Sequence, residues 1–298
     1  MPARAAWKSA LAMLACALAL AAAAADTLYA TSLRGEAAGT GFVAGNLYSV
    51  DPSTAAAKLI GPIRLGDVAV GITAVATHPR TGVFYGITAG LSPAVPRSLV
   101  TVDLESARAT AVGKLAARGS DLAFSADGTL YMWLPDLRRM AKVDLQTAAI
   151  EPLGPSGIEA GASGGIAIDR SAGKAYLAAT GAMGTLDTID LQTGAGTRGP
   201  PLTGAIFPAS IDNMTFSPSG VLYAVNSNGG APSNAVLVTI DTATGAMRKV
   251  GALPADTRGL IFAPEREAAN PGEAARKWIL VALAALAVIL MLVAARMK

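Results

Sequence analysis

The sequence predicts an all-β protein, a five-bladed β-propeller closed by pairing of its N- and C-terminal strands and followed by a single transmembrane α-helix. Three observations lead to this prediction. A strand–turn–strand unit recurs five times, the first and last strands each lack a partner in their own unit, and one long uncharged run lies near the C-terminus.

The N-terminal segment 1–25 has the pattern of a secretory signal peptide. Arg4 and Lys8 precede an Ala/Leu-rich run that ends in three alanines before Asp26. We expect cleavage after Ala25 and export of the remaining chain. Cys16 offers an alternative as the acylated residue of a lipoprotein, although the apolar stretch before it is short.

An apolar strand that ends in aspartate marks each repeat. The aspartates are Asp51, Asp103, Asp144, Asp190 and Asp241. A hydroxyl residue stands three positions after each of them, and a glycine ten positions after four of them and nine after the fourth: Gly61, Gly113, Gly154, Gly199 and Gly251. Asp, Ser and Thr side chains bind the backbone of tight turns, so we interpret these aspartates as turn caps and not as a calcium site.

A second hairpin precedes each of these units, as in 121–131 and 213–223. Four short strands, A to D, therefore recur at roughly the 40–50-residue period of a propeller blade. The chain starts with a B strand at 27–29 and ends with an A strand at 258–262. Pairing of these two strands completes the remaining blade and covers the sheet edges that the ring would otherwise expose there.

Each predicted B strand contributes one tyrosine. These residues are Tyr29, Tyr85, Tyr131, Tyr176 and Tyr223. Half-buried aromatic side chains favour strands, so we expect them to pack between neighbouring blades.

Leu222-Tyr223, the run Thr239-Ile240-Asp241-Thr242-Ala243-Thr244-Gly245, and Lys249-Val250-Gly251 form the clearest repeat. Such units resemble the repeats of bacterial extracytoplasmic β-propellers of the NHL and YVTN kind, and the resemblance covers 26–265. It implies the propeller fold. It implies no single activity, because such propellers include scaffolds, ligand binders and some enzymes.

The C-terminal region predicts a membrane anchor. Trp278 to Ala295 are eighteen residues without a charge, which as a helix span roughly 27 Å, close to one hydrocarbon core. Basic residues flank the run on both sides. We therefore expect a propeller at 26–265, a stalk at 266–277, a transmembrane helix at 278–295 and a cytoplasmic tail at 296–298. A buried helix and a sorting tail that is cut off are the alternatives.

The residue inventory excludes several classes of function. The exported part 26–275 holds eighteen basic and twenty-one acidic residues without a dense basic stretch, so nucleic acid is not an expected partner. His78 is the only histidine, in a turn at 78–82, and Cys16 is the only cysteine. Cysteine–histidine zinc sites and nucleophile pairs therefore cannot form. We predict no catalytic residue, metal or cofactor.

Variation in loop length indicates a binding face. The B–C connections at 32–45, 89–97 and 226–235 are long, and in a propeller they emerge on the same face as the D–A connections. The A strands are expected to begin there, at Thr73, Asp121, Gly165, Asn213 and Gly259. We predict that Asp121, Asp212, Asn213 and Arg258 converge at the channel mouth as a binding site for a cation or a small polar ligand. Capping of the strand ends is the alternative role.

The sequence thus favours an extracytoplasmic binding or interaction module, anchored to the cell membrane through 278–295. Its partner is expected to be a protein or a small polar ligand. The alternative function is a metal-dependent hydrolase or isomerase at the channel mouth. Resemblance to lactonase-like propellers implies it, since these place Asp, Asn and Glu around a metal ion, and Asp121, Asp212 and Asn213 fit that pattern in part.

Overall fold

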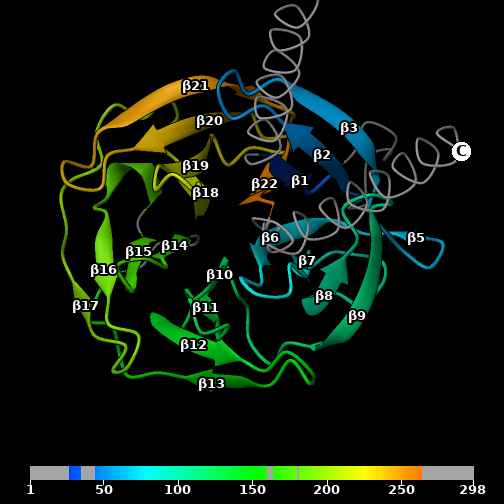
Figure 1. Cartoon of the computed structure of the whole chain (residues 1–298), viewed down its shortest axis with the longest axis horizontal. Coiled ribbons are helices and arrows are strands. Elements are labelled where there is room, and N and C mark those ends of the chain that lie inside the picture. The colour runs from blue at the N-terminus through cyan, green and yellow to red at the C-terminus, as the bar shows by residue number, and fades with distance from the viewer. Residues whose placement is uncertain (1–26, 35–43, 160–163, 180, 264–298) are drawn as a thin grey trace, which may run out of the picture. The chain divides into compact units, whose positions relative to one another are not determined.

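The computed structural model describes residues 27–34, 44–159, 164–179 and 181–263, all of which belong to one compact unit. Within this unit five sheets, each built on four antiparallel strands, surround a central axis with the A strand innermost (Figure 1). This arrangement confirms the predicted five-bladed propeller.

The blades are numbered from the one that contains the N-terminal strand. Blade 1 consists of β22 (Thr257–Phe262), β1 (Leu28–Ser32), β2 (Asn46–Val50) and β3 (Ala57–Pro62). Blade 2 consists of β6 (Ile72–Thr77), β7 (Phe84–Thr88), β8 (Ser98–Val102) and β9 (Arg108–Lys114). Blade 3 consists of β10 (Leu122–Phe124), β11 (Leu130–Leu134), β12 (Arg139–Val143) and β13 (Ile150–Pro152). Blade 4 consists of β14 (Gly165–Asp169), β15 (Lys174–Ala178), β16 (Asp187–Ile189) and β17 (Gly196–Thr197), with a short 3₁₀ helix, η1 (Gly181–Met183), between β15 and β16. Blade 5 consists of β18 (Ser210–Phe216), β19 (Leu222–Ser227), β20 (Ala235–Ile240) and β21 (Met247–Leu253).

Blade 2 carries two further strands that the repeat pattern does not predict. The connection from blade 1 forms a small hairpin of β4 (Arg64–Leu65) and β5 (Val68–Ala69). Strand β4 pairs in parallel with β9, on the outer side of the blade.

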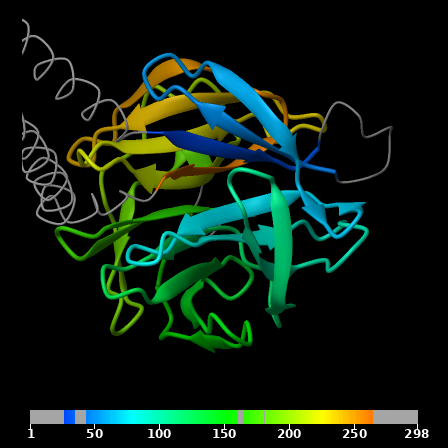
Figure 2. The ribbon, with the colours of Figure 1, turned by 45° about the vertical axis from the view of Figure 1, so that its right-hand side comes forward.

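The first and last strands close the ring. Strand β1 pairs antiparallel with β22, with Leu28 opposite Phe262 and Ala30 opposite Leu260. Figure 2 shows β1 in dark blue alongside β22 in orange. The inner strands β6, β10, β14, β18 and β22 contact one another in sequence, and β22 contacts β6 again. The predicted closure by the terminal strands is therefore confirmed.

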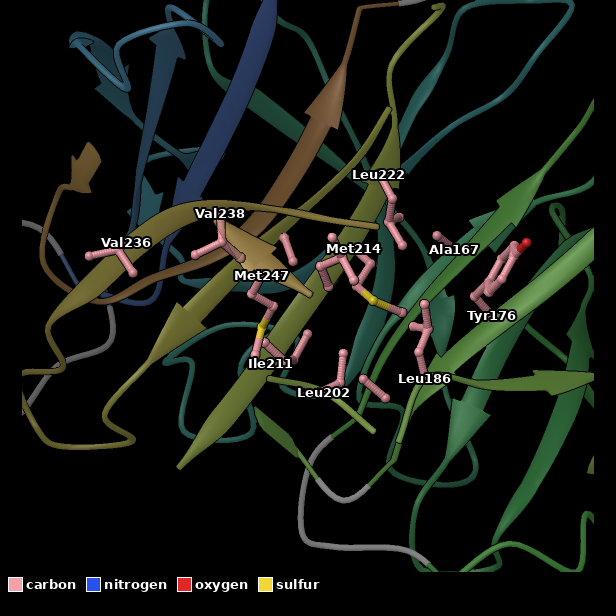
Figure 3. Packing of buried hydrophobic residues seen from close by; sticks show 13 residues of the cluster. Ala167, Tyr176, Leu186, Leu202, Ile211, Met214, Leu222, Val236, Val238 and Met247 are labelled. Atoms are coloured by element: carbon pink, nitrogen blue, oxygen red, sulfur yellow. The ribbon is translucent and has the colours of Figure 1, made fainter. Parts of the chain in front are cut away.

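The hydrophobic core lies between the blades. Figure 3 shows one cluster, in which Tyr176 and Leu186 of blade 4 lie close to Met214 and Leu222 of blade 5. The Tyr176 ring lies 5.6 Å from that of Phe216 between ring centroids. The other four B-strand tyrosines likewise pack against residues of the following blade, as predicted.

The repeated aspartates cap the C–D turns, as predicted. Asp144 Oδ1 accepts hydrogen bonds from the N–H and the hydroxyl of Thr147, both at 2.7 Å. These donors lower the pKa of Asp144, the hydroxyl most strongly. Asp103 with Ser106, and Asp190 with Thr193, repeat the arrangement.

At three of its five positions the repeated glycine is required by the neighbouring blade. A Cβ atom at Gly113 of β9 would lie 2.5 Å from the carbonyl oxygen of Thr147, in the capped turn of blade 3. Gly154 and Gly251 face the same turn of the next blade, at 2.4 Å in each case. At these three places the capped turn therefore presses against a glycine of the preceding blade, which fixes the spacing of the two blades.

The predicted signal peptide, transmembrane helix and cytoplasmic tail lie outside the described residues, as does the stalk. Among the residues that the structure describes, none forms a helix of the length and apolarity that a bilayer crossing requires.

Candidate functional site

Asp121 and Asn213 meet at the centre of the ring, and both are fully buried. The Asn213 side-chain amide donates to Asp121 Oδ1, which also accepts the N–H of Leu122 at 2.8 Å. Asp121 Oδ2 accepts the N–H groups of Ile166 at 2.8 Å and Met214 at 3.3 Å. Asn213 Oδ1 in turn accepts the N–H of Leu260 at 2.9 Å.

These contacts join the inner strands of blades 3, 4, 5 and 1 through one carboxylate and one amide. Burial raises the pKa of Asp121 well above its ordinary value, while the N–H donors and the Asn213 amide oppose that rise. Both groups are enclosed, and their hydrogen bonds link four of the five inner strands, so they hold the ring together.

Asp212 and Arg258 form a second pair, closer to solvent. Arg258 Nη1 donates to Asp212 Oδ2 at 2.8 Å, with the two side chains 17% and 6% exposed. The hydroxyls of Ser210 and Ser227 also donate to the Asp212 carboxylate. The four predicted site residues therefore form two pairs with different environments, one sealed inside the ring and one at its surface.

The Asp212–Arg258 pair lines a pocket of about 290 Å³. The pocket is built mainly from blade 2 and from the connection between blades 2 and 3, with smaller contributions from blades 1 and 5. Its full lining consists of Leu33, Thr73, Ile87, Thr88, Gly90, Arg97, Leu115, Ala117, Arg118, Gly119, Ser120, Asp212 and Arg258.

Arg97 and Arg118 are pocket residues that the sequence reasoning missed. Arg97 ends the B–C connection of blade 2 and is exposed, and a Cβ atom at Gly90 would lie 3.2 Å from its Nε atom. Arg118 lies in the connection from β9 to β10 and pairs with Asp136 at 3.4 Å. The next residue, Gly119, has no room for a side chain, because its Cβ would lie 2.2 Å from Met132 Sδ.

B–C and D–A connections meet on the side of the ring where the pocket lies. The N–H of Leu33, after β1, donates to the carbonyl of Asp256, before β22, at 2.8 Å. Asp256 also accepts the N–H of Ser233, from the B–C connection of blade 5, through its carboxylate at 2.8 Å. The B–C and D–A connections thus share one face, as the loop argument expects.

The inner strands begin at slightly different residues from those predicted. Asn213 is the fourth residue of β18, which starts at Ser210 and carries a bulge between Ile211 and Asn213. Strand β22 starts at Thr257, two residues before Gly259, and Asp121 directly precedes β10. A bulge contributes to the shift in blade 5, because it adds one residue that alternation of buried positions does not reveal, and β6 and β22 carry equivalent bulges.

His78 directly follows the last residue of β6, whereas the pocket residue Thr73 lies near the start of that strand. Its Nδ1 atom accepts the N–H groups of Arg80 and Thr81, and its ring packs against Phe124. Burial lowers the pKa of His78, and Arg80 and Arg170 add to the effect. Within the described part of the chain, no three His, Cys, Asp or Glu side chains are grouped so that they hold a metal ion.

Fold and repeats together define a β-propeller repeat protein, a class whose fold is consistent with a protein-interaction module. No family model matches the chain, and no curated protein matches it.

Solved structures do resemble it. A chain from a crystal structure of a nidogen/laminin complex superposes with a TM-score of 0.52 at 13% identity, over 80% of this chain and 99% of that chain. A Bacteroides thetaiotaomicron structural genomics protein of unknown function gives 0.46 at 15% identity, over 66% of this chain and 53% of that one. Kuenenia stuttgartiensis hydrazine synthase gives 0.39 at 20% identity, over 65% and 51%. At these identities the nidogen/laminin likeness supports the fold alone.

Proposed function

We propose that the protein is a non-catalytic binding module, held at the extracytoplasmic side of a membrane, that recognises a partner protein with its B–C and D–A connections. The observation that carries the proposal is the pocket, because these connections supply its rim: Leu33 and Arg97 from B–C connections, and Arg118 from a D–A connection. Loops on a rigid scaffold are the usual place for binding residues.

Exposed apolar side chains on the same face support a protein partner. Leu91 and Leu137 lie in the B–C connections of blades 2 and 3, and they are 80% and 53% exposed. Met183 in η1 of blade 4 is 74% exposed, and Ile206, in the connection to blade 5, is 42% exposed. Large apolar side chains that remain in water gain free energy when a partner covers them.

Support for the anchor and for export comes from the sequence, through the uncharged run at 278–295 and the N-terminal pattern at 1–25. Cell fractionation of the full chain, together with the intact mass of the mature protein, tests both. The proposal expects a membrane-bound species that begins at Asp26 and retains Lys298. A soluble species, or one that begins at Met1, would contradict it.

The binding face is tested by affinity enrichment from the native host with the full chain and two double variants. Leu91→Asp with Met183→Asp places charge on the proposed face. Val83→Asp with Val221→Asp places the same charge in the A–B turns, where these valines are 38% and 40% exposed. We expect the first variant to lose its partner and the second to retain it. Equal retention by both variants, with unchanged thermal unfolding, would reject the binding face.

A further inference from the structure

The pocket has an excess of positive charge. Arg97, Arg118 and Arg258 line it, against the single carboxylate of Asp212. Arg258 already donates to Asp212, and two serine hydroxyls complete the hydrogen bonds of that carboxylate. Arg258 is therefore balanced within the wall. The other two guanidinium groups of the wall belong to Arg97 and to Arg118, and Arg118 pairs with Asp136 outside the wall.

Arg118 is able to exchange its partner. Its ion pair with Asp136 joins side chains that are 39% and 67% exposed, and Asp136 is not part of the pocket wall. Exposed pairs of this kind contribute little stability, so a ligand anion that is shielded from water competes well for the guanidinium group.

The remaining wall is largely apolar. Ile87 and Leu115 are buried and contribute to the pocket, and Leu33 and Ala117 are partly exposed there. A volume of about 290 Å³ is at the lower end of small-ligand pockets. The site therefore suits a small group that is anionic at one end and apolar at the other.

We propose that this pocket binds a carboxylate attached to an apolar body, with the carboxylate on Arg97 and Arg118 and the body against Leu33, Ile87 and Leu115. A guanidinium group matches the two oxygens of a carboxylate in a planar, two-bond pair. Either a free organic acid or the C-terminal carboxylate of a polypeptide with an apolar last residue supplies this chemistry. The inference rests on the proposed function, since it specifies what the binding face recognises.

The test is calorimetric titration of the purified full chain with matched acid and amide probes. The probes are 3-phenylpropanoate and 3-phenylpropanamide, a hexapeptide that ends in leucine as its free acid and as its amide, and inorganic phosphate. We expect each acid that binds to do so about tenfold or more tightly than its amide, because the amide lacks the charge. Binding of only one of the two acids identifies the source of the carboxylate.

Three matched variants assign the contact. Arg97→Gln and Arg118→Gln are each expected to weaken acid binding about tenfold. Arg108→Gln removes the same charge from the outer strand β9, where Arg108 is exposed and is not a pocket residue, and is expected to leave affinity unchanged. A further measurement needs no variant. Phenylglyoxal labelling read by mass spectrometry should show that the bound acid protects Arg97 and Arg118 but not Arg108.

Equal affinity for acid and amide, tighter binding of phosphate than of either acid, or no protection of Arg97 and Arg118 would overturn the inference. These failures are distinct from failure of the proposed function. Partner capture that depends on Leu91 and Met183 would survive them, and acid binding would survive a result in which those residues have no effect on capture.

Discussion

The side-chain amide of Asn213 donates a hydrogen bond to the carboxylate of Asp121, which lies 92 positions earlier in the chain. Through this contact, and through the backbone N–H groups bound to both side chains, two residues connect four of the five inner strands. Both were predicted as ligand-binding groups. Their burial instead supports the alternative role, in which these polar side chains cap strand ends through hydrogen bonds to the backbone.

Replacement of Asn213 by alanine should therefore destabilise the propeller without an effect on the pocket. The variant leaves the Leu260 N–H without its acceptor and removes one donor from the buried Asp121 carboxylate. We expect a loss of about 1–3 kcal/mol in the free energy of unfolding, measured by chemical denaturation. Asp67→Asn, at an exposed position in the β4–β5 hairpin, is the control and should have no measurable effect. Unfolding curves that coincide for Asn213→Ala and the wild type would contradict this role.

The pH dependence of stability should report on Asp121. Its folded-state pKa is raised above the value of 3.8 expected for an unfolded aspartate, chiefly by burial. The stability associated with this shift is fully present below pH 3.8 and is lost as the pH rises through the folded-state pKa. Relative to Asp121→Asn, the wild-type chain should lose up to about 1.4 kcal/mol per pH unit over that window. A difference between the two chains that stays constant from pH 4 to pH 8 would show that the pKa is not raised.

The spacing between blades 2 and 3 should depend on Gly113, which faces the capped turn of blade 3. Gly113→Ala places a Cβ atom 2.5 Å from the Thr147 carbonyl oxygen, so blade 3 must move or the glycine strand must shift. Gly61→Ala is the matched control at the equivalent position of blade 1, where the nearest atom, Ala107 Cβ, is 4.0 Å away. We expect Gly113→Ala to cost about 1–3 kcal/mol in unfolding free energy and Gly61→Ala to be nearly neutral. Equal losses of unfolding free energy in the two variants would show that Gly113 is not required for the packing of blade 2 against blade 3.

The repeat made most of the fold predictable from the sequence. Asp51, Asp144 and their equivalents stand at fixed positions in tight turns, so local hydrogen bonding determines them and they can be recognised along the chain. The β4–β5 hairpin was not predictable, since it does not recur in the other blades. The bulge before Asn213 has counterparts at Thr73 of β6 and Arg258 of β22, but the bulged residues differ in type and share no sequence signal.

The candidate site was only partly predictable. Asp212 and Arg258 were predicted as ligand-binding residues at the channel mouth, and in the structure they form an ion pair that lines the pocket. Arg97 and Arg118 were missed because they belong to connections rather than to the inner strands. Arg97 ends the B–C connection 89–97, which is unusually long. The presence of a charged residue in a long connection was the sequence signal for this position.

Ring closure is the central claim, because the pocket needs it: Leu33 follows β1 and Arg258 lies on β22, at opposite ends of the chain that closure brings together. Hydrogen exchange of the full chain, followed by mass spectrometry of peptides that cover 27–33 and 257–263, measures it directly. If β1 completes blade 1, the amides of both segments should exchange as slowly as those of β18 and β19 in the continuous blade 5. Exchange within seconds in 27–33, as in a frayed terminus, would mean that the ring is open and that the pocket does not exist in solution.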